Sequence, residues 1–290
     1  MNYSKVWKFF PLIAIVSLSF IIKKSALKSY TLVEQWKTPA SLQIPESVVY
    51  DGVRNSLYVS NIHGDFQAKD GKGYISKLSL DGRIENLKWI TGLNAPKGLG
   101  LYKDKLYIAD NTTIVVADVK SGKILNKIEV KDALFLNDIT VDTEGNVYVS
   151  DFQAKKIYKL SGATVTVVYE NEKLINPNGL LSLEKELLMV DMGSGILYSI
   201  DPKSSKATIV ADSLNGADGI EQIAPGEYLV SNFNGEIYYV NRSGDVKLIL
   251  DTKIDKINAA DIEYIADKKL LLIPTFFANT VAAYKLELRK

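Results

Sequence analysis

The stretch PNGLLSLEKELLMVD, residues 177–191, carries the pattern that decides the fold. An Asn-Gly pair opens a short apolar run, a polar turn follows, and a second apolar run ends on an aspartate. Two short apolar runs joined by a polar turn are typical of paired β-strands. The pattern occurs in five further stretches: PESVVYDGVRNSLYVSN (45–61), PKGLGLYKDKLYIAD (96–110), NDITVDTEGNVYVSD (137–151), ADGIEQIAPGEYLVSN (217–232) and ADIEYIADKKLLLIPT (260–275). Six such units predict a repeat architecture.

Each unit continues with a third strand, such as KIYKL (156–160), and five units add a fourth strand after a turn. Four antiparallel strands in about forty residues correspond to one blade of a β-propeller. The sixth unit ends one strand short, whereas YTLVEQW (30–36) reads as a strand without a partner. The sequence therefore predicts an all-β fold, a single six-bladed β-propeller over residues 30–290. The N-terminal strand is expected to close the last blade and remove its exposed edge.

Length and composition exclude several classes of function. The 290 residues suffice for one large β domain or two ordinary domains, and the repeat favours one. A net charge of +1, with both signs interspersed, gives no basic surface for nucleic acid. The chain has no cysteine, so disulfides, thiolate metal sites and a cysteine nucleophile are absent. Its one histidine, His63, rules out a three-histidine zinc site.

The N-terminal residues 1–29 differ from the rest of the chain. The apolar run FFPLIAIVSLSFII (9–22) lies between pairs of lysines and suits a signal peptide better than a membrane span of about 20 residues. No clear cleavage site follows, so a membrane anchor is the alternative. We expect export to a periplasmic or extracellular location, with a membrane tether if the segment is retained.

Polar residues occupy the start of the first strand in each unit. Superposing the units aligns Glu46, Lys97, Asp138, Asn178, Asp218 and Asp261, with Asn137 one residue before the third of these positions. First strands of propeller blades lie beside the axis, so these side chains are expected to ring one mouth of the channel. Hard oxygen donors without His or Cys suit calcium, or less readily magnesium. The alternative is that these residues only shape the turns into each blade.

At these positions the sequence resembles the SMP-30/gluconolactonase/LRE-like family, relatives of the phosphotriesterase diisopropyl fluorophosphatase. The likeness rests on PES with Glu46, LND with Asn137, PNGL with Asn178 and ADG with Asp218, in order and one blade apart. It implies a calcium cofactor held by these four side chains. It also implies that Asp218 is the catalytic base or nucleophile, and that the reaction is hydrolysis of a small-molecule lactone, ester or phosphotriester.

The sequence departs from the family at a position that contacts substrate. Gluconolactonase-like members carry an arginine two residues before the blade-three asparagine, and here that residue is Phe135. A phenyl ring favours a more hydrophobic substrate than a sugar lactone, unless Phe135 packs in the core. Lys97 either binds substrate as a second electrophile or pairs with Asp138 or Asp261. Asp261 is then a ligand, a substrate contact or that partner.

The longest loop is NIHGDFQAKDGKGY, residues 61–74, which we call the insert. It is expected at the mouth, where His63 would serve proton transfer as part of a lid, or simply be solvated. The rival to a hydrolase is a non-catalytic propeller that binds a small ligand, a glycan or a protein at the same mouth. The sequence leaves the oligomeric state open.

Overall fold

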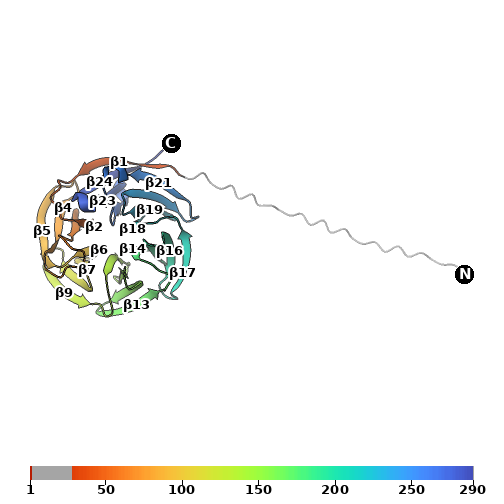
Figure 1. The fold of residues 1–290 in the computed structure, drawn as a ribbon, viewed down its shortest axis with the longest axis horizontal. Helices are drawn as coiled ribbons and strands as arrows, with labels where there is room; N and C mark the ends of the chain where they lie inside the picture. The colour runs from red at the N-terminus through yellow and green to blue at the C-terminus, as the bar shows by residue number, and fades with distance from the viewer. Residues whose placement is uncertain (2–27, 290) are drawn as a thin grey trace.

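The computed structural model describes Met1 and residues 28–289, which form six four-stranded antiparallel sheets arranged in a ring (Figure 1). The predicted six-bladed β-propeller is confirmed. The expected signal peptide or anchor lies almost wholly outside the described residues. Within the described part of the chain, no helix combines the length and the apolar character required to cross a membrane.

The strands follow the order of the units, from the axis outward in each blade. Blade one consists of β2 (Pro45–Asp51), β3 (Ser56–Asn61), β4 (Gly73–Ser79) and β5 (Ile84–Leu93). Blade two consists of β6 (Pro96–Tyr102), β7 (Lys105–Asp110), β8 (Thr113–Asp118) and β9 (Ile124–Glu129). Blade three consists of β10 (Leu136–Val141), β11 (Val147–Asp151), β12 (Lys156–Ser161) and β13 (Thr164–Glu170). Blades four and five consist of β14 (Pro177–Ser182), β15 (Leu187–Asp191), β16 (Ile196–Asp201), β17 (Lys206–Ala211); and β18 (Ala217–Ala224), β19 (Glu227–Asn232), β20 (Glu236–Asn241), β21 (Val246–Asp251). Blade six consists of β22 (Glu263–Ile265), β23 (Leu270–Pro274), β24 (Val281–Leu288) and β1 (Tyr30–Lys37), and short 3-10 turns are η1 (Lys253–Asp255), η2 (Ala266–Lys268) and η3 (Phe276–Ala278).

Strands near the axis are apolar on both faces because neighbouring blades cover both sides of each sheet. All five residues of β15 are buried, whereas the outer strand β17 exposes half of its residues. A cluster of buried apolar side chains fills each junction between neighbouring blades. The apolar residues of each unit's second strand therefore pack between neighbouring blades and hold the blades together.

The ring is closed by β1, as predicted. β1 pairs antiparallel with β24 from Tyr30 opposite Leu288 to Lys37 opposite Ala282, with an irregularity between Glu34 and Trp36. Blade six thereby gains its fourth strand from the other end of the described chain (Figure 1). The pairing leaves β24 without an open edge and completes the circle of blade interfaces.

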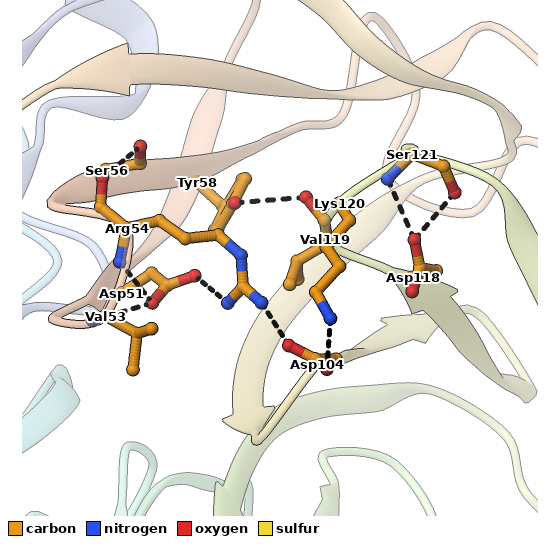
Figure 2. Close-up of polar contacts among 10 residues, drawn as sticks. All are labelled: Asp51, Val53, Arg54, Ser56, Tyr58, Asp104, Asp118, Val119, Lys120 and Ser121. Atoms are coloured by element: carbon orange, nitrogen blue, oxygen red, sulfur yellow. Dashed lines mark hydrogen bonds and ion pairs between the residues drawn. The ribbon is translucent and has the colours of Figure 1, made fainter.

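Charged contacts join blades one and two on the face opposite the mouth (Figure 2). The Arg54 guanidinium in the β2–β3 turn bridges Asp51 of its own blade and Asp104 of the next. Lys120 Nζ lies 2.8 Å from Asp104 on the other side, and Tyr58 donates a hydrogen bond to the Val119 carbonyl. Such partly exposed pairs contribute modestly, so burial between blades dominates the stability of the ring.

The strand registers correct part of the superposition of the units. Each inner strand of blades one to five has a bulge in which two residues face one on the next strand. In blade three, Leu136 pairs with Asp151 and Ile139 with Val149, so Asn137 rather than Asp138 occupies the ring position.

Blade six needs the same correction. Glu263 faces Leu272 as Glu221 faces Leu229 in blade five, which aligns Ala260 with Asp218. Asp261 therefore lies one residue further along. We define the ring position as Glu46, Lys97, Asn137, Asn178, Asp218 and Ala260, and the second layer as Ser47, Gly98, Asp138, Gly179, Gly219 and Asp261. The assignments of Asp138 and Asp261 to the ring position were wrong because the hairpins that join first and second strands differ in length, so the sequence alone does not align the strand starts.

Glycines in the second layer allow the inner strands to meet at the axis. A Cβ on Gly98 would lie 2.5 Å from the Asp138 Cα, and one on Gly179 would clash with the carbonyl oxygen of Asp218. The Asn-Gly pair at 178–179 is therefore no hairpin tip. Asn178 presents its side chain to the axis, and Gly179 lets the next blade approach.

We predict that Gly179→Ala destabilises the protein, because the added methyl group meets backbone that cannot move without shifting a blade. Overpacking of this kind lowers the free energy of unfolding by about 1 to 3 kcal/mol. In a chain of this size, each kcal/mol lowers the melting temperature by roughly 2 to 4 °C. Thermal unfolding measures the loss. Gly52→Ala is the control, since its Cβ would make only ordinary contacts. Equal melting temperatures for the two variants would contradict the packing argument.

Candidate functional site

A cavity of about 300 Å³ opens at the mouth where the inner strands begin. Five of its lining residues are polar and occupy the ring position of blades one to five. Eight are apolar and come from the loops above the ring. The lining residues are Glu46, Lys97, Asn137, Asn178 and Asp218, with Ile62, Phe66, Phe135, Phe152, Met192, Phe233, Phe276 and Phe277.

The ring residues are positioned by carboxylates at the ends of the second strands. Asp191, which ends β15, accepts hydrogen bonds from the backbone amides of Ile175 and Asn176, both at 2.8 Å. Asp110 and Asp151 bind the corresponding amides in their own blades. The aspartate that ends the second strand of these blades therefore has a structural role. It fixes the loop from which each inner strand descends to the axis.

A hydrogen-bonded chain links three of the ring residues. Asn137 Nδ2 donates to Asn178 Oδ1 at 2.9 Å, and Asn178 Nδ2 donates to Asp218 Oδ1 at 3.3 Å. Within residues 28–289, Glu46 Oε2 and Asn137 Oδ1 are among the few buried side-chain atoms without a hydrogen-bond partner. Both residues line the cavity and are 6% exposed. Leaving such oxygens unpaired is costly, so they indicate a missing positive or hydrogen-donating group.

The electrostatics of the ring favour a cation. Burial raises the pKa of the Glu46 carboxyl well above its usual range, and the charges of Asp218 and Asp261 raise it further. Burial and Asp261 likewise raise the pKa of Asp218, against the hydrogen bond from Asn178. A divalent cation would reverse both shifts. In the described part of the chain, no three His, Cys, Asp or Glu side chains cluster as a metal site, so a cation here would also need the two amides.

Lys97 pairs with neither Asp138 nor Asp261 among the described residues, and its bonds go to backbone carbonyls instead. Its Nζ donates to the carbonyl of Ala95 at 2.9 Å and to that of Phe66 in the insert at 3.0 Å. The same nitrogen lies 4.3 Å from the centre of the Phe135 ring. Lys97 is 2% exposed, and burial lowers its pKa to about 8 although Glu46 raises it. Its charge therefore holds the insert over the mouth.

The structure brings together six of the eight sequence-predicted site residues. Glu46, Lys97, Phe135, Asn137, Asn178 and Asp218 all line the cavity. Phe135 is half-buried and faces this space rather than the core.

Two predicted residues lie elsewhere. His63 is outside the cavity lining, and its Nδ1 lies 3.2 Å from the Lys72 carbonyl oxygen within the insert. Asp261 lies in the second layer, where Ser47 donates a 2.6 Å hydrogen bond to it. Asp261 also shares a hydrogen bond with Asp138. Neither side chain lines the cavity that holds the four oxygen donors, because the insert turns His63 aside and the strand register places Asp261 one residue beyond the ring position.

Most of the apolar wall was not found from the sequence. Four residues of the wall directly follow the last residue of a second strand: Ile62, Phe152, Met192 and Phe233. Their shared place in the repeat is the signal that could have identified them. It is easily missed because one apolar residue after a strand usually indicates packing.

A second group of acids lies further along the axis. Asp138, Asp261, Glu221 and Glu263 line a smaller cavity of about 130 Å³. Burial raises the pKa of Asp261 to about 6 and that of Glu263 to about 8. The folded protein therefore keeps protons on these groups at pH values where the unfolded chain has lost them.

We predict that the stability of the metal-free protein falls as pH rises between about 4.5 and about 8, the interval between the two pKa values of Glu263. Glu263→Gln should flatten this dependence and stabilise the protein at pH 8, because the amide never ionises. Thermal unfolding in chelator across the interval provides the measurement. Glu184→Gln, in an exposed turn, should leave the profile unchanged. An unaltered slope in Glu263→Gln would show that this carboxyl ionises normally.

Comparisons with known proteins match the fold only. No family model matches the chain, and no curated protein matches its sequence. A catalytically inactive histidine-to-alanine variant of virginiamycin B lyase from Staphylococcus aureus, with quinupristin, has a TM-score of 0.64 at 12% identity, covering 89% of this chain and 99% of that chain. A streptogramin B lyase scores 0.63 at 11% identity, covering 90% and 98%. A chain of a nidogen/laminin complex scores 0.63 at 15% identity, covering 80% and 96%. The chain thus shares its propeller fold with enzymes and with a component of a protein complex.

Proposed function

We propose that the protein is a calcium-dependent hydrolase of a lactone, ester or phosphotriester, with its active site at the mouth cavity. The observation that carries this proposal is the pair of unpartnered oxygens, Glu46 Oε2 and Asn137 Oδ1, buried in a cavity that also receives Asn178 and Asp218. Export to the periplasm or cell exterior is part of the proposal and rests on the sequence of residues 1–29 alone.

The donor set fits a hard divalent cation. Glu46, Asn137, Asn178 and Asp218 offer two carboxylates and two amides, and calcium prefers such oxygens. A bound cation would act as a Lewis acid on the carbonyl or phosphoryl oxygen of the substrate. Lys97 brings a positive charge to the same cavity, but the carboxylates of Glu46 and Asp218 outnumber it.

Asp218 is assigned as the base or nucleophile. It is 5% exposed, and the hydrogen bond from Asn178 holds one carboxylate oxygen and favours the ionised form. Its carboxylate either accepts a proton from the attacking water or attacks the substrate directly. For an ester, the reaction adds one water across the acyl C–O bond and yields a carboxylic acid and an alcohol.

A non-catalytic propeller that binds a small ligand, a glycan or a protein is the alternative. The nidogen/laminin match supports it, since that propeller belongs to a protein complex. A lyase of the matched kind is less well supported. Its inactive variant lacks a histidine, whereas the single histidine of this chain, His63, does not line the cavity.

We predict that calcium stabilises the full-length chain after its metal has been removed with chelator. At about a thousand times its dissociation constant, a ligand adds roughly 4 kcal/mol, and the melting temperature should rise by about 10 °C. Asn178→Ala should abolish most of this shift because it removes a donor and the hydrogen bond to Asp218. Asn126→Ala, on an exposed outer strand, is the control. An equal calcium shift in Asn178→Ala would place the metal elsewhere.

We predict that Asp218→Asn lowers hydrolysis at least a hundredfold, in line with the loss of general base catalysis. The assay uses calcium-loaded protein with phenyl acetate, an alkyl γ-lactone and a dialkyl aryl phosphate. Asp212→Asn, at an exposed aspartate, should keep full activity. Retained hydrolysis in Asp218→Asn would remove this residue from the mechanism. Absence of activity in the unmodified protein, despite calcium binding, would favour the ligand-binding alternative.

A further inference from the structure

Polar and apolar residues line different levels of the mouth cavity. Every polar lining residue occupies the ring position, at the floor. Every lining residue contributed by the loops above is Phe, Ile or Met. A molecule that fills the cavity therefore meets oxygen donors at one end and hydrocarbon around the rest of its length.

The phenylalanines of residues 28–289 gather at this one place. Six of its nine phenylalanines fall within residues 28–289, and all six line the cavity. They are Phe66, Phe135, Phe152, Phe233, Phe276 and Phe277. The six clusters between neighbouring blades in the same part of the chain consist of Leu, Ile, Val, Ala, Met and Tyr, without Phe. Phe276 is buried in a separate small cluster with Ala95 and Ala260, and Phe233 packs against that cluster. The packing between blades does not account for the other four rings.

The rings form two groups. Phe276 lies 4.8 Å from Phe277, 5.0 Å from Phe233 and 5.7 Å from Phe66, measured between ring centres. Blades five, six and one supply this group. Phe135 and Phe152 of blade three form the other, with centres 5.7 Å apart. Aromatic walls from different blades thus border the space above the ring.

The outermost rings remain in contact with solvent. Phe277 is 56% exposed and Phe66 is 40% exposed. Exposed aromatic surface at the entrance of a cavity is stabilised when an apolar group covers it. The only hydrogen-bonding group on the wall side chains of this cavity is the weakly accepting sulfur of Met192, and Lys97 already donates to two backbone carbonyls. A polyhydroxylated molecule would lose its hydrogen bonds to water here without replacement.

We infer that the ligand of this cavity carries one bulky apolar group, alkyl or aryl, next to its reacting ester or lactone. The apolar part of the ligand lies between two sets of aromatic side chains, Phe135 and Phe152 on one side and those around Phe276 on the other. The ester or lactone lies against the ring-position residues at the floor of the cavity. This inference rests on the proposed function for the reaction, but not for the binding. Sugar lactones and other polyols are poor ligands.

Binding is tested with ligands that cannot be hydrolysed. A series of 2-alkylcyclopentanones, from propyl to nonyl, is titrated calorimetrically into the calcium-loaded full-length chain. Each added methylene should tighten binding by up to about fourfold until the cavity is filled. Phe152→Ala and Phe277→Ala should each weaken the longest bound ketone by roughly tenfold. Phe152→Leu should recover most of the affinity, and Ile209→Ala, on the exposed outer strand β17, should change nothing.

The outcomes separate the inference from the proposed function. Affinity that rises with chain length and depends on Phe152 supports the inference, even in a protein without hydrolytic activity. Affinity that is independent of chain length, or tighter binding of a polyhydroxylated cyclopentanone, overturns it even if calcium binding requires Asn178. Melting temperatures of the variants identify any loss caused by misfolding, and Phe277→Ala is the variant least exposed to that risk because its ring is largely outside the core.

Discussion

The close approach of six inner strands at the axis is the constraint on which the rest of the structure depends. It requires glycine where one blade meets the next, as at Gly98 and Gly179. It also crowds the side chains at the strand starts into one small cavity. Polar residues placed there must satisfy one another or a ligand. Asn137, Asn178 and Asp218 do so in part, and the unpaired oxygen of Glu46 shows where the arrangement is incomplete.

The sequence predicted the repeat and the number of blades because the strand pattern recurs in six units. It predicted the closure by β1 because the sixth unit lacks a fourth strand. It failed where geometry depends on one residue. Asn137 and Asp138 are adjacent and both polar, and only the bulge decides which reaches the mouth. Ala260 and Asp261 pose the same ambiguity. The partners of Lys97 are backbone carbonyls, which carry no sequence signal.

The axis combines features that are costly for stability. Glu46, Asp138, Asp218 and Asp261 are buried acids whose pKa values are raised by desolvation, and the charge of Asp261 raises those of the other three further. A core selected for stability alone would replace them with apolar residues. Burial of apolar side chains at the six interfaces between blades offsets the cost of these buried acids. Departures of this kind from ordinary packing are expected at functional sites.

Closure by β1 also fixes where the two ends of the propeller emerge. Inner strands run away from the mouth, so the turn between β18 and β19 lies on the opposite face, and Lys28 pairs there with Glu227. The backbone of Arg289 donates to the Ser29 carbonyl, which keeps both ends together. A support or fused domain attached at either end would therefore leave the cavity facing outward. The propeller can be immobilised through the residues next to Lys28 or Arg289, on a sensor surface for example, with its entrance unobstructed.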